Sequence, residues 1–311
     1  EVDTYEGYIT DTYLVSGVDN EDKSITIDYT KKNGEDDIDK DTFDEAKGVD
    51  AASFYGKSVV IYVKANEETD KDEIIAIAPK ATKNVSLVLD YSEITADTFD
   101  GKTMQYVAEG KTTTETIKFE SEVTYLYNGR AEDGTRKEAQ AFLTAPQAGF
   151  VELLDKENDK EFDFVLVTQY EDNYVVGAVE AETKQVIDVN EAAIADIDID
   201  NEDVITKFYT ADGAVASFDD IAADDVLTLA TSADGKLVTV YISKVKVTGA
   251  VTEKRTNKAG NVLYTIDGNE YTANGVTPEV GDEGAFFISV DNRIVYKDTT
   301  SVKSDNYAFL Y

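Results

Sequence analysis

The stretch Tyr264-Thr265-Ile266-Asp267-Gly268-Asn269-Glu270-Tyr271 carries the pattern that decides the fold. Apolar or aromatic residues alternate with polar ones on both sides of a central Asp-Gly pair. An alternation with period two is typical of a half-buried β-strand, and Asp-Gly suits a tight hairpin because both positions tolerate positive φ. The stretch therefore predicts a strand, a tight turn and a return strand.

The same kind of pattern recurs along the whole chain. Turn dipeptides separate short strand-like runs at Asn33-Gly34, Asp100-Gly101, Asn128-Gly129, Asp133-Gly134, Asp212-Gly213, Asp234-Gly235 and Asn274-Gly275. The runs are rich in β-branched and aromatic residues, as in Val59-Val60-Ile61-Tyr62-Val63. Helical patterns are few and short, at 43–47, 136–143 and 191–194. The pattern predicts an all-β protein in which helices are only connectors.

A degenerate internal repeat divides the chain. Three similar stretches open with Gly7-Tyr8-Ile9, Gly177-Ala178-Val179 and Gly249-Ala250-Val251. A repeat of about five strands is the size of a small barrel or sandwich. We therefore expect tandem small β-barrel or β-sandwich domains in an elongated array. The predicted domains are 1–84, 85–171 with an acidic turn and a pattern of its own, 172–246 and 247–311.

Two absences limit the chemistry of the chain. None of its 311 residues is histidine or cysteine, so it lacks the usual general base near neutral pH, the thiolate nucleophile and the common zinc ligands. With no distinctive pair of carboxylates either, we expect no enzyme activity.

Charge and hydropathy narrow the partners. The net charge of −35 disfavours nucleic acid, which binds clustered Lys and Arg. No apolar run approaches the ~20 residues of a membrane-spanning helix, so no membrane insertion is expected. The chain opens at Glu1 rather than Met, and we expect a processed form or a fragment.

One acidic string is a candidate metal site. Between 155 and 163 acids fall at alternate positions, and hard oxygen ligands at such spacing can bind calcium; the candidate ligands are Asp155, Glu157, Asp159, Glu161 and Asp163. Lys160 stands where a calcium loop has its sharp-turn glycine, and no acid follows at the twelfth position, Leu166. These departures favour a solvated acidic hairpin turn, so weak or no specific calcium binding is expected, and no other cofactor.

One part of the chain resembles a known family. The segments are Gly149-Phe150-Val151-Glu152-Leu153-Leu154-Asp155 and Phe162-Asp163-Phe164-Val165-Leu166-Val167-Thr168-Gln169-Tyr170-Glu171. They resemble a repeat region of large Gram-positive cell-surface proteins, clostridial and bacillar, that often carry S-layer homology domains. Tyr127-Asn128-Gly129 and Thr248-Gly249-Ala250-Val251-Thr252 are similar to other signatures of that region. The resemblance implies a secreted, wall-associated stalk of β repeats.

These observations support one leading hypothesis and two alternatives. The leading hypothesis is a non-catalytic structural protein of the bacterial cell surface: an S-layer, surface fibre or stalk component that self-associates. The alternatives are an adhesin or polysaccharide-binding module array, with cell-wall polysaccharide as a partner, and an extracellular hydrolase that uses carboxylates. The segment Tyr307-Ala308-Phe309-Leu310-Tyr311 reads as a strand that could pair with another copy.

Overall fold

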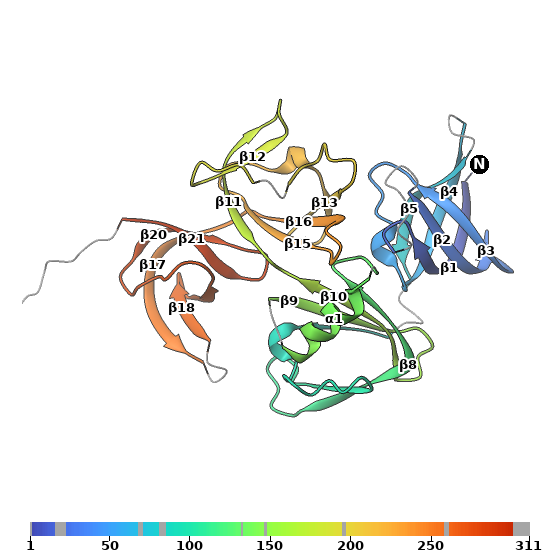
Figure 1. Cartoon of the computed structure of the whole chain (residues 1–311), viewed down its shortest axis with the longest axis horizontal. Coiled ribbons are helices and arrows are strands. Elements are labelled where there is room, and N and C mark those ends of the chain that lie inside the picture. Colours follow the sequence, from blue (N-terminus) through green and yellow to red (C-terminus); the bar gives the residue numbers. More distant parts are fainter. Residues whose placement is uncertain are drawn as a thin grey trace, which may run out of the picture. The chain divides into compact units, whose positions relative to one another are not determined.

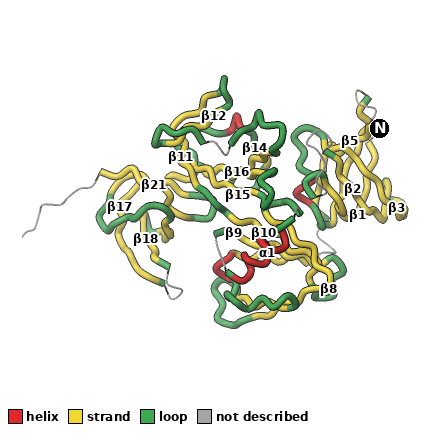
Figure 2. The backbone as a smooth tube through the Cα atoms, in the orientation of Figure 1, coloured by secondary structure: helices red, strands yellow, loops and turns green. Residues whose placement is uncertain are grey.

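The structure is a computed structural model that describes residues 2–15, 23–67, 71–80, 85–131, 133–145, 148–194, 197–257 and 261–300. It is nearly all β, with 57% strand and 7% helix (Figures 1 and 2). The predicted all-β fold of tandem small β units is therefore confirmed. The expected strand at 307–311 lies outside the described residues.

The N-terminal sheet is a closed barrel with the strand order β1-β2-β3-β5-β4 (Figure 1). Strands β3 and β5 are parallel, and all other neighbours are antiparallel. Period-two alternation turns Ile25, Ile27 and Tyr29 into the barrel, where all three are buried. The elements are β1 (Val2–Thr12), β2 (Ser24–Lys32), β3 (Glu35–Glu45), η1 (Ala52–Phe54), β4 (Ser58–Asn66) and β5 (Lys71–Pro79). We call this sheet module 1.

The C-terminal sheet, module 4, repeats that topology. It is a closed barrel in the order β17-β18-β19-β21-β20, again with the third and fifth strands parallel. The predicted hairpin at 264–271 is confirmed as β18 and β19, joined by Asp267 and Gly268 at positive φ. The strands are β17 (Val245–Thr256), β18 (Val262–Ile266), β19 (Asn269–Ala273), β20 (Glu283–Ile288) and β21 (Arg293–Thr300).

Module 2, the second sheet, has the same circular strand order but is open between its first and second strands. Its order is β6-β9-β10-β8-β7, which is 1-4-5-3-2 when the strands are counted along the chain, and β8 and β10 are parallel. A short helix lies between its third and fourth strands. The elements are β6 (Val85–Asp90), η2 (Tyr91–Glu93), β7 (Thr103–Tyr106), β8 (Glu115–Tyr127), α1 (Thr135–Thr144), β9 (Gly149–Asp155) and β10 (Phe162–Gln169).

Module 3 is open at another place, between its second and third strands. Its order β12-β11-β15-β16-β13-β14 is 2-1-4-5-3 followed by a two-residue strand. The segment after β12 pairs with the open edge, because Ile194 donates its N–H to the Val186 carbonyl. The elements are β11 (Asn173–Glu180), β12 (Gln185–Asp188), β13 (Ile205–Thr210), β14 (Val215–Ala216), η3 (Phe218–Asp220), β15 (Val226–Thr231) and β16 (Leu237–Ser243).

All four modules therefore share one circular order, 1-2-3-5-4. In modules 1, 2 and 4, where strands three and five are parallel, this is the connectivity of the five-stranded OB-fold barrel. The internal repeat seen in the sequence thus extends to residues 85–169, where the sequence pattern had looked distinct.

The hydrogen bonds correct one detail of the repeat. In three modules a strand-one residue donates its N–H to the backbone carbonyl of the residue just before the fourth strand. These donors are Ile9, Val176 and Val251. Gly7 and Gly249 come two residues before Ile9 and Val251, whereas Gly177 comes one residue after Val176. The predicted alignment of Gly177 with the other two glycines is therefore wrong by three residues.

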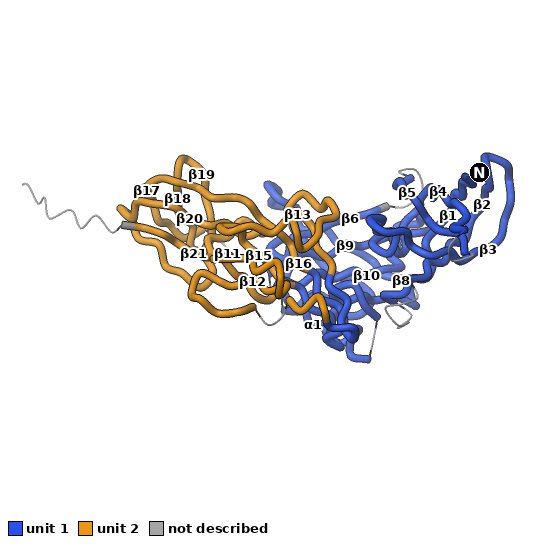
Figure 3. Tube along the Cα trace, turned by 90° about the horizontal axis from the view of Figure 1, so that it is seen from above, with its two compact units in different colours: residues 1–170, 201–206, 230–239 blue, residues 171–200, 207–229, 240–311 orange. Residues whose placement is uncertain are grey.

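The chain divides into two compact units (Figure 3). Unit 1 holds modules 1 and 2 together with residues 201–206 and 230–239, and unit 2 holds 171–200, 207–229 and the chain from 240 onward, which includes module 4. Each unit has buried apolar clusters of its own, in which a fully buried Val, Leu, Ile or Phe contributes about 1.5–3 kcal/mol.

Candidate functional site

The acidic string predicted as a calcium candidate forms the turn between two strands of module 2. Asp155 ends β9 and Asp163 lies in β10, which pairs with β9 in antiparallel fashion. Asn158 and Lys160 both have positive φ, 59° and 80°. The chain thus turns sharply at Lys160 without the glycine that a calcium loop has there.

The carboxylate of Asp155 is turned toward the backbone of its own loop. Its side chain is buried, and Oδ1 accepts the N–H groups of Asn158 and Asp159 while Oδ2 accepts the N–H of Lys160 at 2.8 Å. Three peptide donors occupy lone pairs that a cation would otherwise use. The arrangement makes Asp155 an internal support of the turn.

The other four acids are not brought together around one point. Asp163 accepts the N–H of Lys156 at 2.7 Å and Asp159 accepts that of Glu161 at 3.0 Å. Glu161 lies 4.0 Å from the ammonium of Lys118, and Glu157 is exposed. Within the described part of the chain, no group of three or more acidic side chains has the geometry to hold a metal ion. Weak or absent calcium binding remains a prediction.

We expect Asp155→Asn to lower the free energy of unfolding by about 1–3 kcal/mol, because one amide oxygen cannot accept bonds that two carboxylate oxygens accept now. Thermal melts would measure the loss. Glu157→Gln is the matched control, since it removes the same charge from an exposed position of the same turn. Calcium and sodium at equal ionic strength should change the melting temperature alike. A large calcium-specific rise that Asp155→Asn abolishes would contradict this account.

A second polar cluster, in unit 1, joins module 2 to the β15–β16 turn. The amide of Asn128 donates to the carbonyl of Thr231 at 2.7 Å, and Nε of Arg130 lies 3.0 Å from Oδ2 of Asp234. Asn128 and Arg130 are both buried. The sequence marked Asn128 and Asp234 only as turn residues, because nothing in the pattern indicates that turns a hundred residues apart meet.

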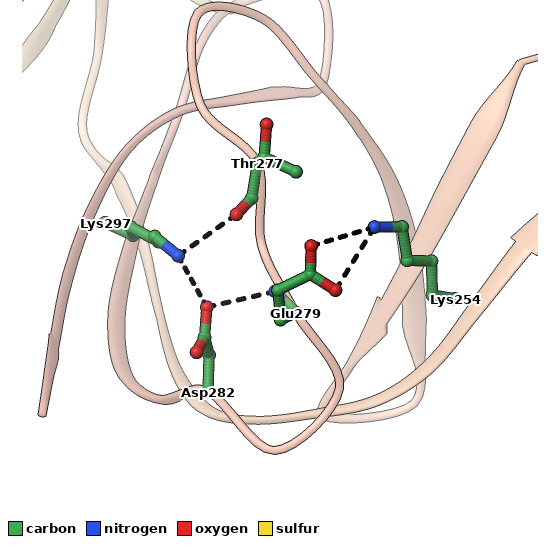
Figure 4. Close-up of polar contacts among 5 residues, drawn as sticks. All are labelled: Lys254, Thr277, Glu279, Asp282 and Lys297. Atoms are coloured by element: carbon green, nitrogen blue, oxygen red, sulfur yellow. Dashed lines mark hydrogen bonds and ion pairs between the residues drawn. The ribbon is translucent and has the colours of Figure 1, made fainter. Parts of the chain in front are cut away.

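A third polar cluster holds the loop before the fourth strand of module 4 (Figure 4). The ammonium of Lys297 donates to Asp282 at 2.6 Å and to the carbonyl of Thr277 at 3.1 Å. Lys254 donates to both carboxylate oxygens of Glu279, whose own N–H donates to Asp282. Two lysines from two strands thus hold one loop in place. The carboxylates serve as hydrogen-bond acceptors in these contacts rather than as reactive groups.

The ion pair between Asp282 and Lys297 makes the stability of the fold depend on pH. The hydrogen bond from Lys297, with that from the N–H of Glu279, holds the pKa of Asp282 below its usual value. A carboxyl whose folded-state pKa is depressed contributes fully above its unfolded pKa, about 3.9, and loses that contribution as pH falls through the folded pKa.

Asp282→Asn should therefore cost about 1 kcal/mol at neutral pH, and its difference from the parent should shrink as the pH falls below about 4. Thermal melts between about pH 2 and pH 7 would measure it. Glu253→Gln, at an exposed position of β17, is the charge-matched control. A difference from the parent that does not change with pH would contradict the ion-pair account.

Comparison with known proteins finds no protein-family model that matches the chain and no curated protein similar to it. The resemblance to Gram-positive surface-protein repeats therefore remains a prediction. No helix in the described residues is long and apolar enough to cross a membrane.

Proposed function

We propose that the chain is a non-catalytic structural component of a bacterial cell surface: a self-associating part of an S-layer, fibre or stalk. The observation that carries the proposal is the fourfold use of one circular strand order in consecutive sheets of a single chain. Tandem modules that contact their neighbours can build extended structures.

The placement of aromatic residues supports a role as a structural scaffold rather than as a binding module. OB-fold barrels that bind oligosaccharides or oligonucleotides use the face of the second and third strands, and exposed aromatic rings there provide stacking surfaces. In module 1 the aromatic residues of these strands are Tyr29 and Phe43, and in module 4 they are Tyr264 and Tyr271. All four are buried.

Polar contacts link these two strands of module 1. The hydroxyls of Thr26 and Thr42 lie 3.0 Å apart across β2 and β3, and Asp28 pairs with Lys40 beside them. These contacts tie one strand to the next. These contacts support a structural use of β2 and β3, in which their side chains hold neighbouring strands together.

The carboxylates are also used in a way that favours a structural role. A general acid near neutral pH needs a raised pKa, but hydrogen bonds from backbone and side chains lower the pKa of Asp188, Asp220 and Asp282. The pKa of Glu120 is raised, first by desolvation and then by the charges of nearby acids of the 155–163 turn. We propose no enzymatic activity, on the ground that the chain has neither histidine nor cysteine.

The polysaccharide-binding array stays the second candidate, because the OB-fold connectivity is one that often binds sugars. Fold alone does not define function. A glycan screen on the full chain would favour this alternative if it gave a saturable ligand whose binding is lost on substitution of a residue on β2 or β3.

Negative-stain imaging of the purified chain, alone and with calcium, tests the structural role. We expect ordered assemblies at high protein concentration. Isolated particles under all conditions, together with turnover in a peptide or glycan substrate screen, would contradict the proposal.

A further inference from the structure

The turn before the fourth strand is built in the same way in three modules. A turn residue with positive φ donates its N–H to the carbonyl of a residue in strand one. That strand-one residue in turn donates its own N–H to the carbonyl of the next residue of the turn. These residues are Gly56, Lys57 and Ile9 in module 1, Asp224, Asp225 and Val176 in module 3, and Gly281, Asp282 and Val251 in module 4. We call 55–57, 223–225 and 280–282 the docking turns.

In unit 1 the docking turn of module 1 lies against module 2. The rings of Tyr55 and Phe164 meet edge to face with centroids 5.6 Å apart. The ammonium of Lys57 lies 2.8 Å from Oε2 of Glu152. Gly56 sits so close that an added Cβ would come within 3.3 Å of the Phe164 ring. An aromatic contact and an ion pair therefore hold this junction.

In unit 2 the docking turn of module 3 and the strand that follows it lie against module 4. Asp224 pairs with Lys246 of β17 at 2.7 Å. Val226, directly after the turn, shares a buried cluster with Phe287 of β20. An apolar contact and an ion pair again hold the junction.

The receiving surfaces of the two junctions correspond. Gly149 and Gly284 hold the same place, since an added Cβ on either would meet a carbonyl oxygen of the fifth strand, at 2.0 and 2.2 Å respectively. Glu152 and Phe287 follow these glycines by three residues each (152 − 149 and 287 − 284). One position on the fourth strand, Glu152 in module 2 and Phe287 in module 4, therefore lies at the junction in both units.

Module 4 has a docking turn of its own whose side chain is exposed. Val280 corresponds to Tyr55 of module 1, and it is 59% exposed. Among the described residues, Val280 belongs neither to the buried cluster inside the module 4 barrel nor to the cluster at the junction of modules 3 and 4. The turn keeps the hydrogen bonds of the docked turns, but its apolar residue is exposed, whereas Tyr55 of module 1 is partly buried; Ala223, at the same place in module 3, is exposed as well.

Module 1 has the matching receiving surface. Counted from the start of the fourth strand, Tyr62 is four residues after Ser58, as Phe287 is four after Glu283. Tyr62 is 38% exposed, and two further exposed apolar residues lie near it in the sheet: Val2 at 45% and Ile75 at 40%. Phe287, in contrast, is buried by its docking partner at 3%.

We propose that the docking turn 280–282 of one copy of this chain binds the Tyr62 surface of module 1 in a second copy. A second copy is the expected occupant, because a residue of the turn or one directly after it already meets this strand-four position twice within the chain: Lys57 meets Glu152, and Val226 meets Phe287. Charge supports it as well: exposed Glu283 follows the turn, and exposed Lys64 lies on the Tyr62 surface, as one Lys–acid pair crosses each existing junction.

Such a contact joins two different surfaces and is therefore heterologous. A heterologous contact that does not close into a ring generates an open filament. This inference rests on the proposed structural role and gives it a mechanism of self-association.

Sedimentation velocity of the full chain and two variants tests the interface. Tyr62→Asp and Val280→Asp change exposed side chains, so both variants should fold, and each should lower the association constant by about tenfold or more. An equimolar mixture of the two should give a dimer and no larger species, because the intact turn of one variant can bind the intact surface of the other. Val215→Asp, at a 52% exposed position of β14, is the control and should associate like the parent.

The outcomes separate this inference from the proposed function. If the parent assembles and both variants assemble equally well, the interface is wrong while the structural role stands. If the mixture associates no better than each variant alone, the head-to-tail arrangement is wrong. If the parent stays monomeric at all concentrations, both the inference and the proposed self-association fail.

Discussion

Gly284→Ala should destabilise module 4 more than any surface substitution. It should lower the free energy of unfolding by about 3 kcal/mol or more. An added Cβ would lie 2.2 Å from the carbonyl oxygen of Asp298 in the neighbouring strand. Residue 284 also has φ of 156°, a backbone conformation that L side chains rarely adopt. Strands β20 and β21 would have to separate, and the barrel closes through β20.

Chemical denaturation of the variant would measure this loss. Gly275→Ala is the matched control, because Gly275 has positive φ of 73° but no atom within 4 Å of an added Cβ. This control should lower the free energy of unfolding by about 1 kcal/mol, which is the cost of the unfavourable backbone conformation alone. Equal losses in the two variants would mean that the close approach of the strands is not a determinant of stability.

Leu237→Ala should destabilise unit 1 by about 2–4 kcal/mol. Leu237 is 2% exposed and belongs to the same apolar cluster as Ile25, Ile27 and Ile61 of module 1. Its Cδ2 is also close to Gly129, where an added Cβ would come within 2.8 Å. A substitution far along the chain is therefore expected to loosen the N-terminal barrel.

Amide hydrogen exchange would locate this effect. Protection should fall in β2 and β4 of module 1, while β18 and β19 of module 4 should keep theirs. Leu263→Ala, at a partly exposed position of β18, is the control and should leave module 1 unchanged. Unchanged protection in module 1 of Leu237→Ala would contradict the assignment of residues 230–239 to unit 1.

Local patterns predicted the strands well because their physical causes are local. The Asp267-Gly268 hairpin formed as expected, since both residues adopt the positive φ that a tight turn requires. The helical pattern at 136–143 corresponds to α1. The pattern at 43–47 was wrong: β3 continues through Phe43, whose side chain is buried in the barrel. No helix forms at 191–194 either.

The strand order could not be predicted from the sequence, because it depends on pairs far apart in the chain. The parallel pairing of β3 with β5 and of β19 with β21 closes each barrel, and no local pattern indicates it. The candidate site shows the same limit. The position of the acidic turn follows from its sequence, but the burial of Asp155 under three peptide donors depends on two left-handed residues, Asn158 and Lys160.

Immunogold labelling of intact cells that produce this chain would test the central proposal most directly. A structural component of the cell surface should give dense labelling of the outer envelope on unpermeabilised cells, and brief protease treatment of those cells should remove it. Labelling that appears only after permeabilisation, inside the cytoplasm, would contradict the account.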